Sequence, residues 1–287
     1  MRRVLVTGAT GLVGRAALPA LAAAGFEVVG LARRLPPTTP FRHVTADLRD
    51  AAELPALLRE IAPTHILHCA WEVTHGRFWT APENLDHVAA TMALARAAGP
   101  VRFVGIGSSA EYDWTGRDQP RREDAACAPA TLYGVAKDAT RRVLAAHFGS
   151  GFAWARLFHI FGPGEQPGRL VPSIAAGMRS GAGFVVRQGL MRADYLATVD
   201  LGAALAALVA SDVEGAVNIG SGEAVALGDL ARAVASAAGG PGVLRVEDGT
   251  PGAMLPDLGR LRREVGVAAP PPLADRLRSL FVPPSVP

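Results

Sequence analysis

The chain has 287 residues, of which 49% are hydrophobic, and a formal net charge of +3. A chain of this length and composition can bury a large core without disulfides or metals, so it predicts a globular protein. The arginines are scattered singly or in pairs, which is typical of a solvated surface and gives no reason to expect a nucleic-acid partner.

Cysteine usage and the N-terminus bear on location. Cys69 and Cys127 are too few for a disulfide framework and belong to no metal-ligand spacing, so we expect a reducing, cytoplasmic environment and no metal site. The chain begins with the apolar run Val4-Leu5-Val6, without a cleavable signal pattern, and no stretch is long and apolar enough to span a bilayer. We therefore expect no membrane partner.

Short apolar runs alternate with longer Ala/Leu-rich segments through the first half, which is typical of βαβ units. The expected strands, in chain order, are Arg3–Thr7, Glu27–Leu31, Phe41–Thr45, His65–Cys69, Val101–Ile106 and Phe152–Leu157. Helical spacing of apolar residues predicts helices at Leu12–Ala24, Ala51–Ile61, Pro82–Ala98 and Thr131–Phe148. The pattern predicts an α/β fold with a Rossmann-type, doubly wound parallel sheet.

After about Gly162 glycine and proline become frequent, and the helices Leu201–Ser211 and Leu227–Ala237 stand apart. We expect residues 1–162 to form mainly a dinucleotide-binding domain. Residues 163–287 are expected to form mainly a smaller, mixed substrate lobe, from which segments can return to the sheet. The proline-rich end of the chain is predicted to be extended or loosely docked.

A glycine-rich segment, Thr7 to Gly14, follows the first strand and opens the first helix. Gly8 permits a tight turn, Gly11 lets backbone N–H groups approach a pyrophosphate, and Gly14 allows close helix–strand packing. This position predicts a dinucleotide site, against the alternative of an ordinary glycine turn. Its further backbone contributors would be Thr10, Leu12 and Val13.

The end of the second strand bears on the choice of cofactor. Where an NAD site offers a carboxylate, this chain has Ala32 followed by Arg33 and Arg34, which could grip a 2′-phosphate. We therefore expect NADP(H) in preference to NAD(H), the alternative being a solvated arginine pair. Asp47 could accept a hydrogen bond from adenine or could serve a structural turn.

Tyr133 and Lys137 are four residues apart on a predicted helix and therefore share a face. Lys137 is the only lysine among the 29 Lys and Arg residues, which marks it for a task that a guanidinium cannot perform. A nearby ammonium favours phenolate, so this pair predicts a general acid or base. Ser109, after the fifth strand, could hold a reacting carbonyl oxygen, or belong to a serine-rich loop that satisfies backbone groups.

Together the Thr7–Gly14 start, the Gly107-Ser108-Ser109 strand end and the Tyr133/Lys137 pair resemble the extended short-chain dehydrogenases, also called the nucleotide-sugar epimerase/dehydratase family. The resemblance implies a catalytic set of Ser109, Tyr133 and Lys137. It adds cofactor contacts from Leu48, Cys69, Ala70 and Phe158, alongside Tyr133 and Lys137. Substrate contacts are implied for Trp71, Ser108, Ser109, Glu111, His159, Arg169 and Arg192.

Two departures from the family pattern limit what it implies. Ala193 stands where the family places an arginine that clamps a nucleotide diphosphate, with Arg192 one residue early. Ala110-Glu111 replaces the Asp-Glu pair of the dehydratases, so elimination is not expected. The resemblance then implies NADPH-dependent reduction of a keto group on a nucleotide-activated 4-keto-6-deoxy sugar.

Alternatives to the reductase are an NAD-dependent nucleotide-sugar 4-epimerase and a non-catalytic dinucleotide-binding sensor. An epimerase would use the same three residues on a retained cofactor, whereas a sensor would need no tuned tyrosine. By analogy with the family, the helices Pro82–Ala98 and Thr131–Phe148 would pair in a homodimer.

Overall fold

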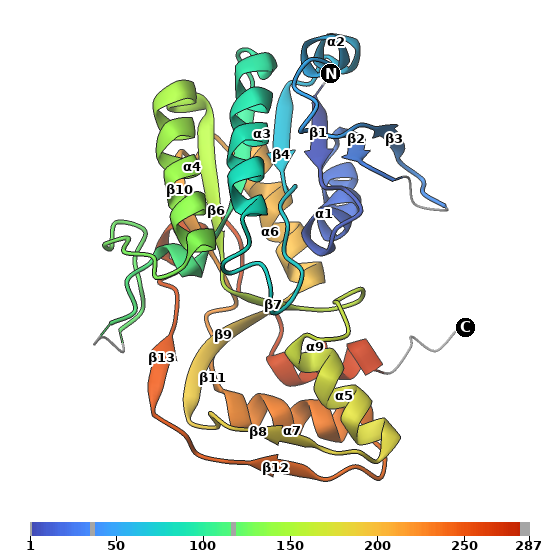
Figure 1. Cartoon of the computed structure of the whole chain (residues 1–287), viewed down its shortest axis with the longest axis vertical. Helices are drawn as coiled ribbons and strands as arrows, with labels where there is room; N and C mark the ends of the chain where they lie inside the picture. Colours follow the sequence, from blue (N-terminus) through green and yellow to red (C-terminus); the bar gives the residue numbers. More distant parts are fainter. Residues whose placement is uncertain (1, 35–37, 116–118, 282–287) are drawn as a thin grey trace.

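The computed structural model describes residues 2–34, 38–115 and 119–281 and places them in two lobes (Figure 1). The larger lobe is built on a seven-stranded parallel sheet between two layers of helices. The smaller lobe, below it in Figure 1, is built on short strands and helices from the second half of the chain.

The large sheet has the strand order β10-β6-β5-β4-β1-β2-β3, and every neighbouring pair is parallel. The strands are β1 (Arg3–Thr7), β2 (Glu27–Ala32), β3 (Arg42–Thr45), β4 (His65–His68), β5 (Arg102–Ser108), β6 (Phe152–Leu157) and β10 (Gly215–Ile219). The order reverses between β1 and β4, and such a reversal opens a crevice at the carboxyl ends of the strands. The predicted Rossmann-type α/β fold is confirmed.

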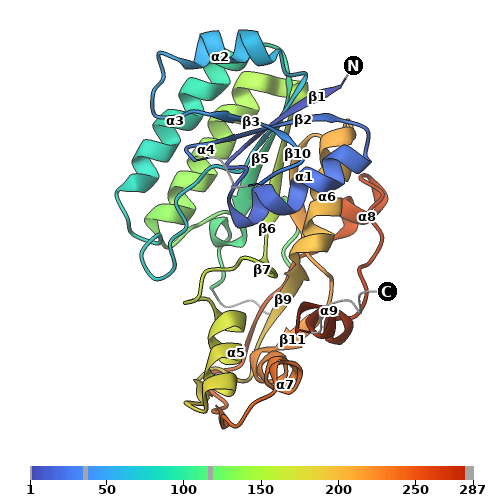
Figure 2. The same cartoon turned by 90° about the vertical axis from the view of Figure 1, so that its right-hand side faces the viewer.

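Helices cover both faces of this sheet (Figure 2). On one face, α1 (Leu12–Ala23) and α6 (Thr198–Ala210) bury Leu18, Leu21 and Leu205 against the strands. On the other lie α2 (Leu54–Ile61), α3 (Glu83–Ala98) and α4 (Leu132–Phe148), whose inward residues form a second apolar cluster. Sheet strands with apolar residues on both faces need this double cover.

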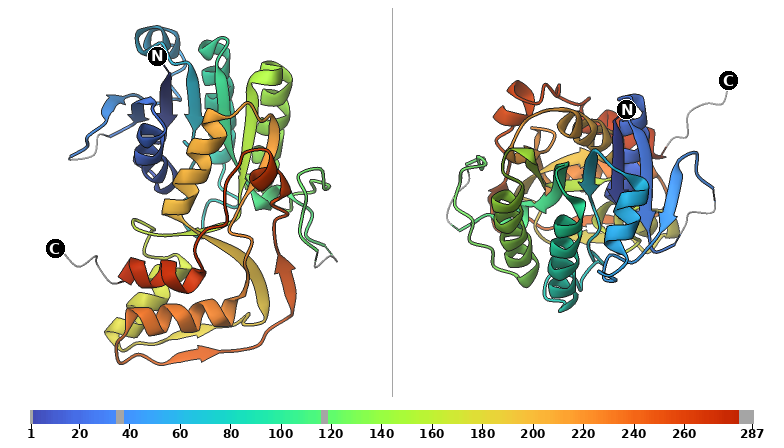
Figure 3. Two further views of the ribbon diagram at one scale, coloured as in Figure 1. Left: turned by 180° about the vertical axis from the view of Figure 1, so that it is seen from behind. Right: turned by 90° about the horizontal axis from the view of Figure 1, so that it is seen from above.

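The smaller lobe is organised around β9 (Met191–Ala197), which pairs with β7 (His159–Phe161), β11 (Ala224–Ala226) and β13 (Gly252–Met254). A separate pair, β8 (Phe184–Val186) and β12 (Leu244–Val246), lies at its far end (Figure 3). The helices α5 (Leu170–Ser180), α7 (Leu227–Ala238) and α9 (Leu273–Phe281) complete the lobe.

Residues 198–219 return to the larger lobe, where α6 packs on α1 and β10 extends the sheet beside β6. The short helix α8 (Gly259–Arg263) also contacts β10. Both lobes are therefore built from non-contiguous parts of the chain. None of the helices in the described ranges is long and apolar enough to cross a membrane.

The expectation of an extended tail was wrong for residues 273–281. There α9 forms directly after Pro270-Pro271-Pro272, and its Leu273 and Leu277 are buried against the smaller lobe. Proline is tolerated at the start of a helix, where its missing N–H has no intrahelical partner to lose. Pro283-Pro284 lies outside the described residues.

Candidate functional site

A cavity of about 670 Å³ opens at the carboxyl edge of the large sheet and extends to the smaller lobe. Its walls come from the glycine-rich turn, the ends of β2, β4 and β5, the start of α4, the loop before α3, and β7 and β9. Of the site residues predicted from the sequence, the cavity is lined by Gly8, Thr10, Gly11, Leu12, Val13, Gly14, Arg33, Asp47, Leu48, Cys69, Ala70, Trp71, Ser108, Ser109, Tyr133, Lys137, Phe158, His159 and Arg169.

The glycine-rich turn has a shape that suits a pyrophosphate. Gly8 has a φ of +64°, and a Cβ there would overlap the backbone of Ala70. A Cβ on Gly14 would overlap the Gly8 carbonyl, so the helix could not pack as closely. Gly11 caps α1, and no side chain among the described residues accepts from the first N–H groups of that helix. These groups carry partial positive charge beside the cavity and fit an anionic ligand.

Beyond β2, the cavity wall includes Arg33 but not Arg34. Both arginines lie in a bend that follows the last residue of β2. No hydrogen bond or ion pair joins Arg33 to another residue of the described ranges, so its guanidinium can meet a ligand. Arg34 is exposed and lies outside the cavity wall, against the prediction for it.

Asp47 serves a structural turn. Its carboxylate accepts hydrogen bonds from the Arg49 backbone N–H at 3.0 Å and from the Arg49 guanidinium at 2.6 Å. The Arg49 hydrogen bond lowers the pKa of Asp47 to about 2, and Arg33 adds to that effect. Arg49 also lines the cavity, so it is a second cation at this end that the sequence pattern did not single out.

Lys137 is buried beneath the cavity, with 3% of its surface exposed. Its Nζ donates to the backbone oxygen of Ile106 at 2.8 Å and lies 5.9 Å from the centre of the Tyr133 ring. Burial lowers the pKa of Lys137 to about 7, an effect that Glu111 opposes. The Lys137 amine is therefore close to half-protonated at neutral pH.

Tyr133 occupies the first turn of α4, which begins after the Thr131 side chain accepts from the Gly134 N–H at 3.1 Å. Burial raises the pKa of Tyr133 to about 12, and hydrogen bonding by the Ser108 side chain opposes the rise. The other charges that act on it are those of Glu111 and Arg169. The expectation that Lys137 lowers this pKa is therefore wrong for the protein alone, because desolvation dominates.

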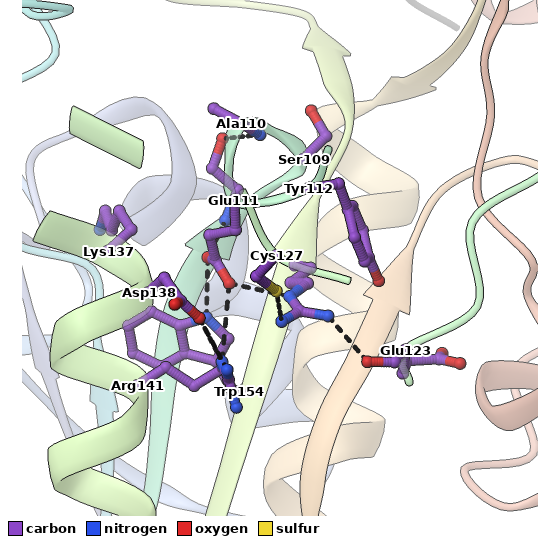
Figure 4. A network of polar contacts seen from close by, with 12 residues as sticks. Ser109, Ala110, Glu111, Tyr112, Glu123, Cys127, Lys137, Asp138, Arg141 and Trp154 are labelled. Atoms are coloured by element: carbon purple, nitrogen blue, oxygen red, sulfur yellow. Dashed lines mark hydrogen bonds and ion pairs between the residues drawn. The ribbon is translucent and has the colours of Figure 1, made fainter. Parts of the chain in front are cut away.

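Both serines line the cavity, and Ser108 is the one whose side chain acts on the pKa of the Tyr133 phenol. Strand β5 continues to Ser108, two residues beyond its predicted end, so this side chain stands at the strand's carboxyl edge. Its Oγ accepts from the Ala110 N–H at 3.1 Å, which leaves its own proton free to donate. Ser109 begins a short 3₁₀ turn and, in Figure 4, its side chain points away from Glu111.

Glu111 was predicted to bind substrate, but the structure places it behind this turn, fully buried and outside the cavity lining. Its carboxylate accepts from the Ser108 backbone N–H at 2.8 Å, from Trp154 Nε1 at 2.9 Å and from Arg156 Nε at 2.8 Å (Figure 4). Arg156 is 1% exposed and donates onward to the Glu123 backbone oxygen. This buried ion pair fixes the end of β5, and with it Ser108.

Arg192 was also wrongly placed. It is exposed on β9 and donates to the Ala224 backbone oxygen, whereas its neighbours Met191 and Ala193 line the cavity. The alternation of a strand turns it away. Arg169 and His159 do line the smaller-lobe side, and the His159 ring lies 5.2 Å from that of Tyr195.

Aromatic residues of the loop before α3 were missed in the sequence. The rings of Phe78 and Trp79 lie 4.9 and 5.8 Å from the Tyr133 ring, both edge to face. The Tyr133 N–H also donates to the Trp79 backbone oxygen at 3.1 Å. The signal in the sequence that could have found them is the close spacing of aromatic residues after Trp71. Together these rings form one wall around the phenol.

Comparison with known proteins identifies the family. Residues 4–220 match the model of the NAD dependent epimerase/dehydratase family, and the chain belongs to that family. The dTDP-6-deoxy-L-talose 4-dehydrogenase (NAD(P)(+)) of Kitasatospora kifunensis is 31% identical over 239 residues, covering 77% of this chain and 74% of the relative. The predicted resemblance is confirmed.

Other matches cover less or are more distant. Methionine adenosyltransferase 2 subunit beta of Xenopus tropicalis is 36% identical over 170 residues, 58% of this chain and 49% of the relative. The chain thus spans about half the length of the first curated relatives it matches. A UDP-glucose 4-epimerase from Thermotoga maritima, solved with UDP-glucose, superposes with a TM-score of 0.84 at 18% identity, covering 97% of each chain. That likeness shows the fold.

Burial of Lys137 makes stability depend on pH. The unfolded lysine keeps its proton up to about its ordinary pKa of 10.5, while the folded one loses it near 7. Between these values the unfolded chain binds more protons, so the free energy of unfolding rises with pH. We expect Lys137→Met to be more stable than the wild type at about pH 6, by a margin that shrinks toward about pH 9.

Urea unfolding at the two pH values measures the margin, and Arg96→Met, which removes an exposed cation from α3, is the control. An equal margin at both pH values would contradict the buried ammonium.

Proposed function

We propose that the protein reduces a keto group on a nucleotide-activated 4-keto-6-deoxy sugar, with NADPH as the hydride donor. The observation that carries the proposal is that Ser108, Tyr133 and Lys137 line the same cavity as the glycine-rich turn. The name of the Kitasatospora relative, a dTDP-sugar 4-dehydrogenase, supports the substrate class.

Tyr133 suits the part of proton donor. A phenol with a pKa raised to about 12 keeps its proton at neutral pH and can deliver it as negative charge develops on a carbonyl oxygen. We assign the orienting hydroxyl to Ser108 in place of Ser109, because the Ser108 side chain lowers the pKa of the phenol and its own hydroxyl proton is free to donate. Lys137 would bind the nicotinamide ribose and stabilise the phenolate left after transfer.

The dinucleotide would lie from Arg33 to Tyr133, with its pyrophosphate at the first turn of α1. When bound, the cofactor supplies the hydride. We propose NADP(H) in preference to NAD(H), because Arg33 and Arg49 both line the adenosine end and Arg33 has an uncommitted guanidinium. A cytoplasmic location is part of the proposal, since Cys69 and Cys127 are free thiols.

The reaction is tested with [4-²H]NADPH and nucleotide 4-keto sugars. Net transfer of deuterium to the sugar, with stoichiometric loss of NADPH, is the expected result. A 4-epimerase would instead interconvert epimers on a retained NAD without net consumption, and a sensor would bind dinucleotide without turnover.

Two serine variants test the assignment of the hydroxyl. Tyr133→Phe is expected to lower kcat by about 100-fold or more, because it removes the proton donor. Ser108→Ala should also lose about 100-fold, the effect of removing a donor to a developing oxyanion. Ser109→Ala, the matched control, should lose far less. Steady-state NADPH oxidation measures all three, and a larger loss in Ser109→Ala would restore the original assignment.

Cofactor preference is tested at the two neighbouring arginines. Arg33→Ala removes a charge-assisted contact with a 2′-phosphate, so KM for NADPH should rise about 10-fold or more while KM for NADH stays nearly constant. Arg34→Ala, outside the cavity wall, should change neither. Equal effects of Arg33→Ala on both cofactors would contradict the proposed phosphate site.

We propose a homodimer formed through α3 and α4, which lie side by side (Figure 1). Their outer faces carry Leu85, Val135 and Val143, which are 60%, 48% and 52% exposed. Leu85→Arg combined with Val143→Arg should convert the dimer to a monomer in sedimentation velocity. Val199→Arg on α6, also at an exposed apolar position, is the control. A wild-type monomer would refute the dimer.

A further inference from the structure

We infer that Trp71 is a positioning residue for Lys137. The face of the Trp71 indole holds the buried ammonium, in the place that a carboxylate partner would otherwise take. The inference deepens the proposed function, because it rests on Lys137 being the ammonium used in the reaction. It adds to the site a residue that neither carries nor receives the transferred proton.

The contact is close and direct. Lys137 Nζ lies 3.7 Å from the centre of the Trp71 ring, well inside the range of a cation–π interaction. The ammonium has three N–H donors, and in the described part of the chain its one hydrogen-bond acceptor is the Ile106 oxygen. The other rings near it, those of Tyr133 and Trp154, are both 5.9 Å away. The indole is therefore its nearest aromatic neighbour.

Trp71 is itself held in place. Its Nε1 donates to Asn84 Oδ1 at 2.8 Å, and the Asn84 amide donates to the backbone oxygens of Phe78 and Ala81, both at 2.8 Å. The ring also stacks on His87 with centres 5.4 Å apart. Because the indole N–H is tethered and one face is stacked, the ring cannot turn its edge toward Lys137. The orientation needed for a cation–π contact is built into the fold.

Few other groups could stabilise the ammonium. The carboxylate that acts on it is that of Glu111, whose oxygens are already engaged by Ser108, Trp154 and Arg156. The Cys69 thiol faces it from the end of β4, but burial raises the pKa of that thiol to about 12, so it carries no charge. The contribution of the indole is then large, since cation–π attraction is strongest when both groups are desolvated.

Burial disfavours a charge on the histidines around Lys137, so they neither attract nor repel the ammonium. Burial lowers the pKa of His68 to about 3, and its ring is fixed between the hydroxyls of Thr7 and Thr91. Burial also lowers the pKa of His87, the residue stacked on Trp71. Removal of the indole should therefore shift the equilibrium of Lys137 toward the neutral amine, which cannot serve as the cation of the site.

The single lysine of the chain makes this directly measurable. Protein grown with [¹³Cε]lysine gives one lysine Cε–Hε signal, that of Lys137. In the wild type the signal should be displaced upfield by the ring current of the indole and should titrate with a midpoint near 7. Trp71→Leu should abolish the displacement and lower the midpoint by about one pH unit, while Trp71→Phe, with a weaker π face, should fall between.

Trp79→Phe is the matched control. Trp79 is another aromatic residue of the cavity in contact with Tyr133, yet its ring is not among those near the ammonium, so the lysine signal should keep its wild-type midpoint. Circular dichroism checks the fold of each variant. If Trp71→Leu fails to fold, the intermediate shift of the lysine midpoint in Trp71→Phe tests the inference instead. A midpoint in folded Trp71 variants equal to that of the wild type would overturn the inference.

The activity profile gives a second readout. The pH dependence of kcat/KM reports groups of the free enzyme, so its fall at high pH should move to lower pH in Trp71→Leu and be partly restored in Trp71→Phe. The lysine signal needs neither cofactor nor substrate. A displaced lysine signal without any ketone reduction would therefore refute the proposed function and leave the role of Trp71 standing.

Discussion

Burial of one ammonium at the carboxyl edge of a parallel sheet is the constraint on which the rest of this site depends. Lys137 is 3% exposed, and among the described residues its hydrogen-bond acceptor is the Ile106 backbone oxygen. The same burial lowers the pKa of Lys137 and raises that of Tyr133, so a protonated phenol stands beside an amine that is partly ammonium at neutral pH. A bound dinucleotide would bring its hydroxyl groups to both Lys137 and Tyr133, and these contacts would make the site reactive.

A buried ion pair in the surrounding structure keeps this arrangement in place. Glu111 and Arg156 form a fully buried ion pair whose remaining polar atoms are satisfied by Trp154, Glu123 and the Ser108 backbone. Buried pairs of this kind contribute little net stability, but they fix geometry because any displacement leaves a charge unpaired. In this protein the ion pair fixes the position of β5 and of its last residue, Ser108. The ion pair thus holds Ser108, while the indole of Trp71 lies 3.7 Å from Lys137 Nζ.

Much of this could be predicted from the sequence, because it follows from local rules. Strand–helix alternation gave the sheet, glycine spacing gave the turn at Gly8, and the lone lysine marked Lys137. The features that the sequence did not predict depend on where a strand ends and on which way a side chain points. Strand β5 runs two residues further than its apolar pattern, so the strand ends at Ser108 and not at Ile106. Strand alternation turns Arg192 away from the cavity, and no local pattern shows that Glu111 folds back under the turn.

A crystal structure of the complex with NADP⁺ would show whether Lys137 and Tyr133 meet the dinucleotide. We expect the dinucleotide to lie along the carboxyl edge of the sheet, with its pyrophosphate on the first turn of α1. A nicotinamide ribose hydroxyl should lie within about 3 Å of Lys137 Nζ, and Tyr133 should face the nicotinamide ring. A dinucleotide bound elsewhere, or a Lys137 side chain left without contact to it, would contradict the account.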